Sequence, residues 1–398
     1  MEDPQERLVT SVSTGELERR WRAIREIMRE RKIHFLVMRQ DEEYYGGYVR
    51  WFSGITPRHS YPVTIIFPID DEMTVISSSP PAPPNEGRPP EWAVRGVKKR
   101  LGAPYYPSLH YTNDYDAELA IGVLKEKKGA TIGFVGMSSI HVPFHQYVTQ
   151  HLPGVTFVDT TDPIDYLKAI KSPEEIDLIK GTARLQDTVI EHLKKVIRSG
   201  LRDLDVNAEA DYVSTKLGAT RLQVLISSYH PGEQPIGFMG RHFMNRVLRE
   251  GDHVIVLLEG NGPGGYYTEI ARVFSLGEPA QEAKDMYALA LEAQELTRKM
   301  LKPGTTPKDI WDANNEFLQK RGSGPEARLY AHGEGYEMVE RPAIRYDEPM
   351  KIQAGMNIAV HPVGKTKRVW TNVCDNYLVT ESGVSPCLHK TPKDIIVL

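Results

Sequence analysis

Apolar residues alternate between helical and strand spacing through the first part of the chain. Residues 15–32 predict an amphipathic helix, because one stripe of apolar side chains runs along an otherwise charged segment. This stripe consists of Leu17, Trp21, Ile24 and Met28. Apolar runs at residues 35–38, 63–67, 73–76 and 131–135 predict strands, the second and third forming a hairpin. With a further helix expected near 115–127, the pattern favours an α/β domain.

A second pattern begins near residue 171. Ser172 is followed by Pro173 and, three residues after the serine, by Glu175, which together predict a capped helix start. The helix is expected to run to about Arg198. Beyond it, expected helices at 205–217 and 280–300 are interleaved with strands at 222–227, 253–259, 267–275, 356–360 and 373–379. Paired strands between helices predict an α+β domain on an antiparallel sheet, so we expect domains at 1–168 and 169–398.

Composition narrows the class of protein. A chain of 398 residues suits two domains, and 40% hydrophobic with 26% charged residues is typical of a globular protein. The net charge of −4 gives no reason to expect nucleic acid or an anionic membrane as partner. A loop rich in Pro, Gly and Ser is expected at 78–90. Two cysteines, a polar N-terminus and no long apolar run favour a cytoplasmic protein.

The candidate metal-binding side chains lie in the second domain. Glu259 ends one apolar strand and Glu269 lies on the next, so a hairpin is expected to bring the two carboxylates together. His332 lies in a glycine-flanked turn, His361 follows an apolar strand, and Cys374 precedes the last one. All five side chains are able to coordinate a metal ion.

In this region the chain resembles the pita-bread family, which includes methionine aminopeptidases, aminopeptidase P, prolidases and creatinase. The pieces occur in family order: the helix start at 170–176, Gly251-Asp252, the Gly265-Tyr266 hairpin, residues 302–306, His332-Gly333, Gly355-Met356 and the strand ending Leu378-Val379-Thr380. The resemblance covers residues 165–398 and implies a pita-bread catalytic domain. Residues 44–54 look like the strand and turn of the creatinase-type N-terminal α/β domain.

The resemblance implies a metal site that this sequence alters. In the peptidases two aspartates on the hairpin, a histidine after the glycine turn and two glutamates on the last strands hold two metal ions. Here Glu259 and Glu269 stand for the aspartates, one residue closer together than usual, while His361 and Cys374 stand for the glutamates. Only His332 is unchanged. Val339 occupies the place of a second histidine in many of these peptidases, which weakens an Xaa-Pro dipeptidase reading.

Two enzymatic hypotheses follow from the altered site. In the first, a creatinase-like enzyme without metal hydrolyses a C–N bond of a small polar metabolite, with His242 as general base and Glu259, Glu269 and His332 in the pocket. Ala271 replaces a glutamate of creatinase, so creatine is not the expected substrate. In the second, one transition ion of the zinc or iron type is held by the five candidate ligands and serves a hydrolase or an osmolyte lyase-like enzyme.

A third hypothesis is a binding module without catalysis. For an enzyme, Arg341 is a candidate for clamping a substrate carboxylate, although the sequence favours a solvated ion-pair cluster at this position. Tyr48 and Trp51 are further substrate-binding candidates, because in creatinase-like homodimers this region approaches the partner's site. Glu334 is expected either to support His332 or to lie exposed. The expected partners are a small-molecule substrate and a second copy of the chain.

Overall fold

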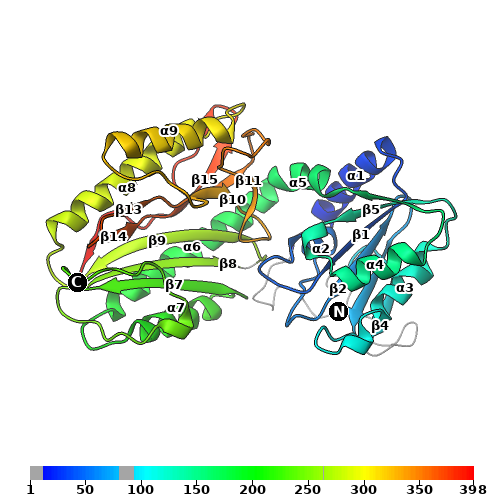
Figure 1. The fold of residues 1–398 in the computed structure, drawn as a ribbon, viewed down its shortest axis with the longest axis horizontal. Coiled ribbons are helices and arrows are strands. Elements are labelled where there is room, and N and C mark those ends of the chain that lie inside the picture. The colour runs from blue at the N-terminus through cyan, green and yellow to red at the C-terminus, as the bar shows by residue number, and fades with distance from the viewer. Residues whose placement is uncertain (1–11, 80–93, 263) are drawn as a thin grey trace. The chain divides into compact units, whose positions relative to one another are not determined.

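The computed structural model describes residues 12–398 apart from 80–93 and 263 (Figure 1). The chain divides into two compact units, the first ending at Lys168 and the second beginning at Ala169. Most of the expected loop at 78–90 lies outside the described residues. Within the described ranges, no helix combines the length and apolar character needed to cross a membrane.

The described part of the first unit is built on a mixed sheet in the order β4-β3-β2-β1-β5-β6. Its strands are β1 (Phe35–Gln40), β2 (Val63–Pro68), β3 (Met73–Ser78), β4 (Val97–Ala103), β5 (Thr131–Val135) and β6 (Thr156–Asp159). Its helices are α1 (Thr14–Glu30), α2 (Gly47–Ser53), α3 (Tyr115–Leu124), α4 (Val142–Gln150) and α5 (Thr161–Ala169), with short turns η2 (His110–Thr112) and η3 (Met137–Ser139). The expected hairpin is confirmed, since β2 pairs antiparallel with β3.

One element of this unit differs from the expectation. Residues 44–54 were expected as a strand and turn, but residues 47–53 form helix α2, which ends at Gly54 in the left-handed conformation with φ 74°. Tyr48, Trp51 and Phe52 recur at helical spacing, so all three aromatic side chains are buried on one short helix. Glycine closes the helix because it adopts this conformation at no steric cost.

The second unit places a long hairpin between helices and a further sheet (Figure 1). Its helices are α6 (Pro173–Val196), α7 (Asp203–Lys216), α8 (Gln281–Met300) and α9 (Pro307–Lys320), with the turn η4 (Arg241–Phe243). The first sheet has the order β17-β9-β8-β7, from β7 (Leu222–Tyr229), β8 (His253–Asn261), β9 (Tyr267–Ser275) and β17 (Ile396–Val397). Helices α6 and α7 pack on it over a core that includes Val189, Leu193 and Phe274.

The remaining strands form the other layer. A five-stranded sheet has the order β11-β10-β12-β15-β16, from β10 (Ala331–Gly333), β11 (Glu340–Ala343), β12 (Asn357–Val360), β15 (Asp375–Thr380) and β16 (Gly383–Val384). A separate ribbon joins β13 (Val363–Lys365) to β14 (Trp370–Asn372), and α8 packs on it. A bridge between Ala271 and Cys374 brings the start of β15 onto β9, so the two layers meet at the hairpin.

The predicted start of α6 is confirmed in atomic detail. Ser172 Oγ accepts a hydrogen bond from the backbone N–H of Glu175 at 3.2 Å, and the Glu175 carboxylate accepts one from the Ser172 N–H at 2.7 Å. This reciprocal cap satisfies two backbone donors that the first helical turn leaves unpaired. It fixes the start of the helix that supports β8 and β9.

Candidate active site

The hairpin brings the two predicted carboxylates face to face. Glu259 of β8 lies directly opposite Glu269 of β9 in the antiparallel register, so both side chains leave the same face of the sheet. On that face Leu257 and Ala271 pack with Cys374, whereas Leu258 and Ile270 face the core under α6 and α7. The alternation of strand residues therefore directs both acids away from the helices and toward the second sheet.

Two histidines from the second sheet reach the same carboxylate. His332 Nε2 lies 3.7 Å from Glu269 Oε2, and His361 Nε2 lies 3.9 Å from the same oxygen. Their rings are 5.1 Å apart. His332 is on β10 and His361 directly follows β12, its neighbour in the sheet. The structure thus brings together four of the five predicted ligands.

The chain fixes the tautomer of His332. Its Nδ1 lies 3.0 Å from the carbonyl oxygen of Gly333, which can only accept a hydrogen bond, so Nδ1 carries the proton. Burial lowers the pKa of His332 to about 4, which keeps the ring neutral at physiological pH. The unprotonated Nε2 therefore directs a lone pair at Glu269, the arrangement of a metal-ligating histidine.

Glu334 also lies in the site, although the sequence left open whether it supports His332 or is exposed. It is fully buried, and its oxygen lies with those of Glu259 and Glu269 in a group whose candidate ligand atoms are all within 4.8 Å of one another. Asn376 Nδ2 donates a hydrogen bond to Glu334 Oε2 at 2.5 Å, while Asn376 Oδ1 accepts one from the Glu269 N–H at 2.8 Å. The exposed alternative for Glu334 is wrong, and Asn376 is a supporting residue that sequence reasoning missed.

Burial and mutual charge dominate the electrostatics of the three acids. Burial raises the pKa of Glu259 to about 7. Burial and the neighbouring carboxylate of Glu259 also raise the pKa values of Glu269 and Glu334 well above the usual range. Burial, then His332 and Arg328, hold the pKa of His361 well below its usual value. The site therefore concentrates charge-bearing groups where water cannot solvate them.

Cys374 lies at the edge of this arrangement. It directly precedes β15 and is fully buried. Burial and then the charge of Glu269 raise the pKa of the thiol well above its usual value. In the described part of the chain, Cys374 belongs to none of the three groups whose candidate ligand atoms lie within 4.8 Å of one another. Its role as a ligand stays a prediction.

The residues predicted as general base or substrate ligands lie outside the groups of candidate metal ligands. His242 is exposed on η4. Arg341, on β11, donates hydrogen bonds to the Glu348 carboxylate, with Nη2 at 2.5 Å from Oε1. In the first unit Tyr48 donates from its hydroxyl to Asp165 Oδ1 at 2.6 Å, and Trp51 is buried with Arg20 over its ring. Their roles as base and substrate ligands stay predictions.

The donor set fits a metal ion. Glu269 Oε2, Glu334 Oε1 and His361 Nε2 are buried polar atoms without a hydrogen-bond partner among the described residues. Buried polar atoms left unpaired cost free energy, and bound cations would satisfy them. Glu269, His332 and His361 provide two imidazoles and one carboxylate, a set that binds zinc or iron and leaves further coordination positions open.

A neighbouring cluster is already neutralised by the protein. Asp375 follows Cys374 on the strand and faces the other way, toward Cys387 and His389. Arg272 Nη2 lies 2.8 Å from Asp375 Oδ1, and Lys393 Nζ lies 3.1 Å from Oδ2. Because two cations already neutralise the Asp375 carboxylate, it has no uncompensated negative charge for a metal ion to offset.

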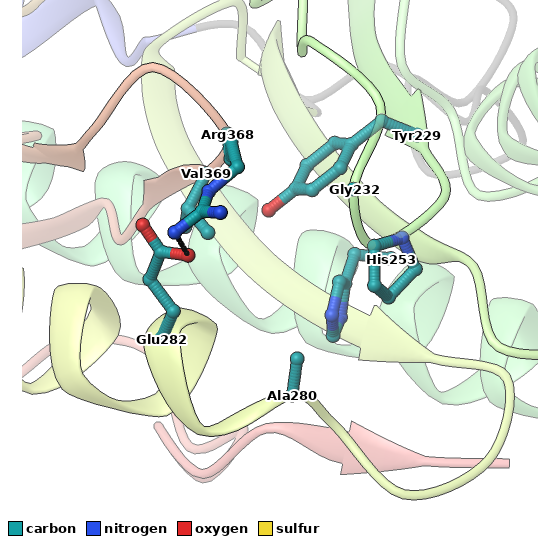
Figure 2. Close-up of a pocket in the computed structure, with 8 residues that line it drawn as sticks. Tyr229, Gly232, His253, Ala280, Glu282, Arg368 and Val369 are labelled. Atoms are coloured by element: carbon teal, nitrogen blue, oxygen red, sulfur yellow. Dashed lines mark ion pairs between the residues drawn. The ribbon is translucent and has the colours of Figure 1, made fainter.

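A pocket at the far end of the hairpin is separate from these acids (Figure 2). Its volume is about 200 Å³, and its lining includes Tyr229, His253 and the ion pair between Glu282 and Arg368, whose atoms are 3.4 Å apart. His253 begins β8 and Glu259 lies six residues further on. At the strand rise of ~3.3 Å per residue, this places the pocket about 20 Å from the carboxylates.

Comparison with known proteins identifies the family of the chain. The model of metallopeptidase family M24 matches residues 177–381, more than half of the chain. The chain belongs to this family. M24 membership places it among the hydrolases and covers the helix, hairpin and second sheet that carry the site.

M24 relatives are distant but cover most of the chain. An Xaa-Pro dipeptidase of Pyrococcus furiosus is 29% identical over 245 residues, 60% of this chain and 68% of that protein. The uncharacterized peptidase YqhT of Bacillus subtilis is 25% identical over 273 residues, 67% of this chain and 75% of that protein. The solved structure of an Xaa-Pro dipeptidase from Bacillus anthracis has a TM-score of 0.75 at 20% identity, covering 96% of this chain and all of the other. The pita-bread fold is therefore confirmed.

Proposed function

We propose that this protein hydrolyses an amide-type C–N bond of a small peptide-like substrate, using a transition-metal ion held by Glu269, His332 and His361. One observation carries the proposal: the two imidazole Nε2 atoms converge on a single carboxylate oxygen, at 3.7 and 3.9 Å. All three groups are buried or nearly so, and His361 Nε2 and Glu269 Oε2 have no hydrogen-bond partner among the described residues. A bound divalent ion polarises a carbonyl oxygen and makes water a stronger nucleophile at neutral pH.

The chain's own residues prepare this site. The Gly333 carbonyl holds the proton of His332 on Nδ1 and so keeps Nε2 available. Asn376 fixes the backbone of Glu269 and the carboxylate of Glu334 at the same time. The surrounding apolar side chains of Leu257, Ala359 and Ala271 exclude water and strengthen every electrostatic interaction inside. Such prior organisation lowers the reorganisation needed during reaction.

The proposed class of substrate rests on the names of the relatives and on the residue at position 339. Several relatives are named dipeptidases, which favours a short peptide or an amide of similar size. Val339 stands where the resemblance places a second histidine, so we propose a substrate other than the usual Xaa-Pro dipeptide. The metal-free hydrolase with His242 as base is the competing proposal. The homodimer and the cytoplasmic location also stay predictions.

Activity of metal-depleted and reloaded protein tests the proposal. Protein treated with a chelator is assayed on dipeptides, small amides and betaines, before and after addition of zinc or ferrous ion. We expect turnover only after reloading, and a loss of about 100-fold or more in His332→Ala and in His361→Ala. Turnover that resists chelation and disappears in His242→Ala supports the metal-free hydrolase instead. A protein inert on the whole panel, with or without metal, supports the binding module.

A further inference from the structure

The site contains two ligand groups that share one residue. Glu269, His332 and His361 form the first group, and Glu259, Glu269 and Glu334 form the second. Within each group the candidate ligand atoms lie within 4.8 Å of one another. The first group, which we call the histidine half, offers two nitrogens and one oxygen. The second, the carboxylate half, offers oxygen alone.

These donor sets select different ions. Imidazole nitrogen suits borderline ions such as zinc and iron, whereas carboxylate oxygen suits harder ions such as magnesium, calcium and manganese. Glu269 reaches both halves, because its Oε2 faces the histidines while its carboxylate also lies in the group with Glu259 and Glu334. A bridging carboxylate holds two ions close together, as in other two-metal sites.

Charge supports occupancy of both halves. In the described part of the chain, none of the three carboxylates accepts a hydrogen bond from lysine or arginine, and nearby Lys171 is bound to Glu340 at 2.7 Å. One divalent ion in the histidine half offsets two of the three negative charges that the acids carry when ionised. The remaining charge lies among the buried carboxylates, where a second cation offsets it.

Glu334 is built to be a ligand. Its Oε2 accepts the hydrogen bond from Asn376, while its Oε1 is buried and without a partner among the described residues. Asn376 lies two residues after Cys374, so both side chains leave the same face of the strand. Cys374, next to β15, occupies a position where the peptidases have a glutamate. Asn376 of the same strand orients the carboxylate of Glu334, which lies in the turn after β10.

We propose that the protein holds an asymmetric two-ion centre, with a borderline transition ion in the histidine half and a harder divalent cation in the carboxylate half. Glu334 supplies the oxygen ligand that Cys374 does not. The first ion rests on the proposed function, and a second ion is what the resemblance to the peptidases implies. The new elements are the role of Glu334 as a ligand and the division of the site between two kinds of ion. The expected ions are zinc or iron in the first half and manganese or magnesium in the second.

Binding stoichiometry tests this without any substrate. Full-length protein depleted of metal is titrated with zinc, then with manganese, and bound manganese is followed by electron paramagnetic resonance alongside elemental analysis. We expect one equivalent of zinc and one additional equivalent of manganese. Glu334→Gln keeps its amide oxygen for Asn376 but loses the charge, so manganese affinity should fall by at least about 100-fold while the zinc equivalent remains. Glu259→Gln, on another strand, should act in the same way.

Control variants separate the possible failures. Glu337→Gln removes a buried acid three residues from Glu334 that belongs to neither ligand group, and should bind both ions like the wild type. His361→Ala should lose the zinc equivalent. One zinc equivalent with no further manganese site, or manganese binding unchanged in Glu334→Gln, would overturn the asymmetric centre and leave the proposed function standing. No transition ion bound in any variant would sink the proposed function itself.

Discussion

Asn376 donates a hydrogen bond to Glu334 at 2.5 Å, joining residues 42 positions apart inside a fully buried site. The contact leaves the second oxygen of the acid without a partner among the described residues. Cys374 was expected as the ligand from β15, but it is Asn376 of this strand that orients a carboxylate, that of Glu334 in the turn after β10. This contact sets the orientation of the Glu334 carboxylate in the site.

Asn376→Ala should weaken the carboxylate half selectively. Without the amide, Glu334 loses its orienting donor and the Glu269 N–H loses its acceptor. We expect manganese affinity to fall about 10–100-fold, the usual cost of removing a residue that supports a ligand. Isothermal titration calorimetry measures this directly. Equal losses of zinc and manganese affinity would show that Asn376 merely holds the fold.

The metal-depleted protein should be stabilised by removing one acid. Burial and the neighbouring carboxylate of Glu259 raise the pKa of Glu334 well above its usual value, so burying this acid costs free energy at neutral pH when no cation is bound, and Glu334→Gln removes that cost. We expect its Tm to rise by about 2 °C or more, while the stabilisation gained on adding manganese shrinks. Differential scanning calorimetry with and without metal provides both values. A lower Tm in the depleted variant would contradict this account of the charges.

Gly333→Ala should disturb the turn that carries His332. A Cβ atom at this position would lie 2.4 Å from the carbonyl oxygen of Arg341, and backbone on the neighbouring strand cannot give way easily. We expect a loss of about 1–3 kcal/mol in the free energy of unfolding, measured by urea denaturation. Gly240→Ala is the matched control, because its Cβ would meet nothing within 4 Å. Equal stability of the two variants would contradict the packing argument.

Asp252 should give the protein stability that disappears in acid. Burial alone would raise the pKa of this carboxyl, but hydrogen bonds from Arg246 and the Arg249 N–H hold it below the ordinary value of 3.8. A carboxyl with a lower pKa in the folded state adds stability above its ordinary value, and this is lost as pH falls through the folded value. Asp252→Asn should therefore lower Tm most at neutral pH, with the difference shrinking below pH 3.8.

An exposed aspartate serves as the control for this measurement. Asp71 pairs with Lys98, and both side chains are about half exposed, at 50% and 53%. Solvent screens such pairs, so Asp71→Asn should change Tm little at any pH. A Tm difference for Asp252→Asn that is constant with pH would show that its carboxylate charge contributes nothing.

The sequence predicted the helices and strands better than the arrangement of the site. Apolar spacing and the cap at Ser172 located most helices and strands, because those patterns depend on local chemistry. Helix α2 was misread, since the short aromatic run fits both spacings and the resemblance favoured a strand. The hairpin was predicted to bring Glu259 and Glu269 together, and their direct register confirms it.

The completion of the site was not predictable from local patterns. Glu334 lies between two glycines in a turn, where an acid is as often exposed as buried. Its placement depends on contacts with Asn376 and Asn357, which lie far along the chain. Alternation along the last strand offered one usable signal, because Cys374 and Asn376 share a face. Only the assembled sheet shows which acid that face meets.

Anomalous diffraction from crystals loaded with one equivalent of zinc tests the central claim most directly. We expect a single zinc peak about 2.0–2.1 Å from Nε2 of both His332 and His361, with a Glu269 oxygen as third ligand. A zinc peak on the Cys374 sulfur with His361 unbound, or no ordered zinc in the site, would contradict it.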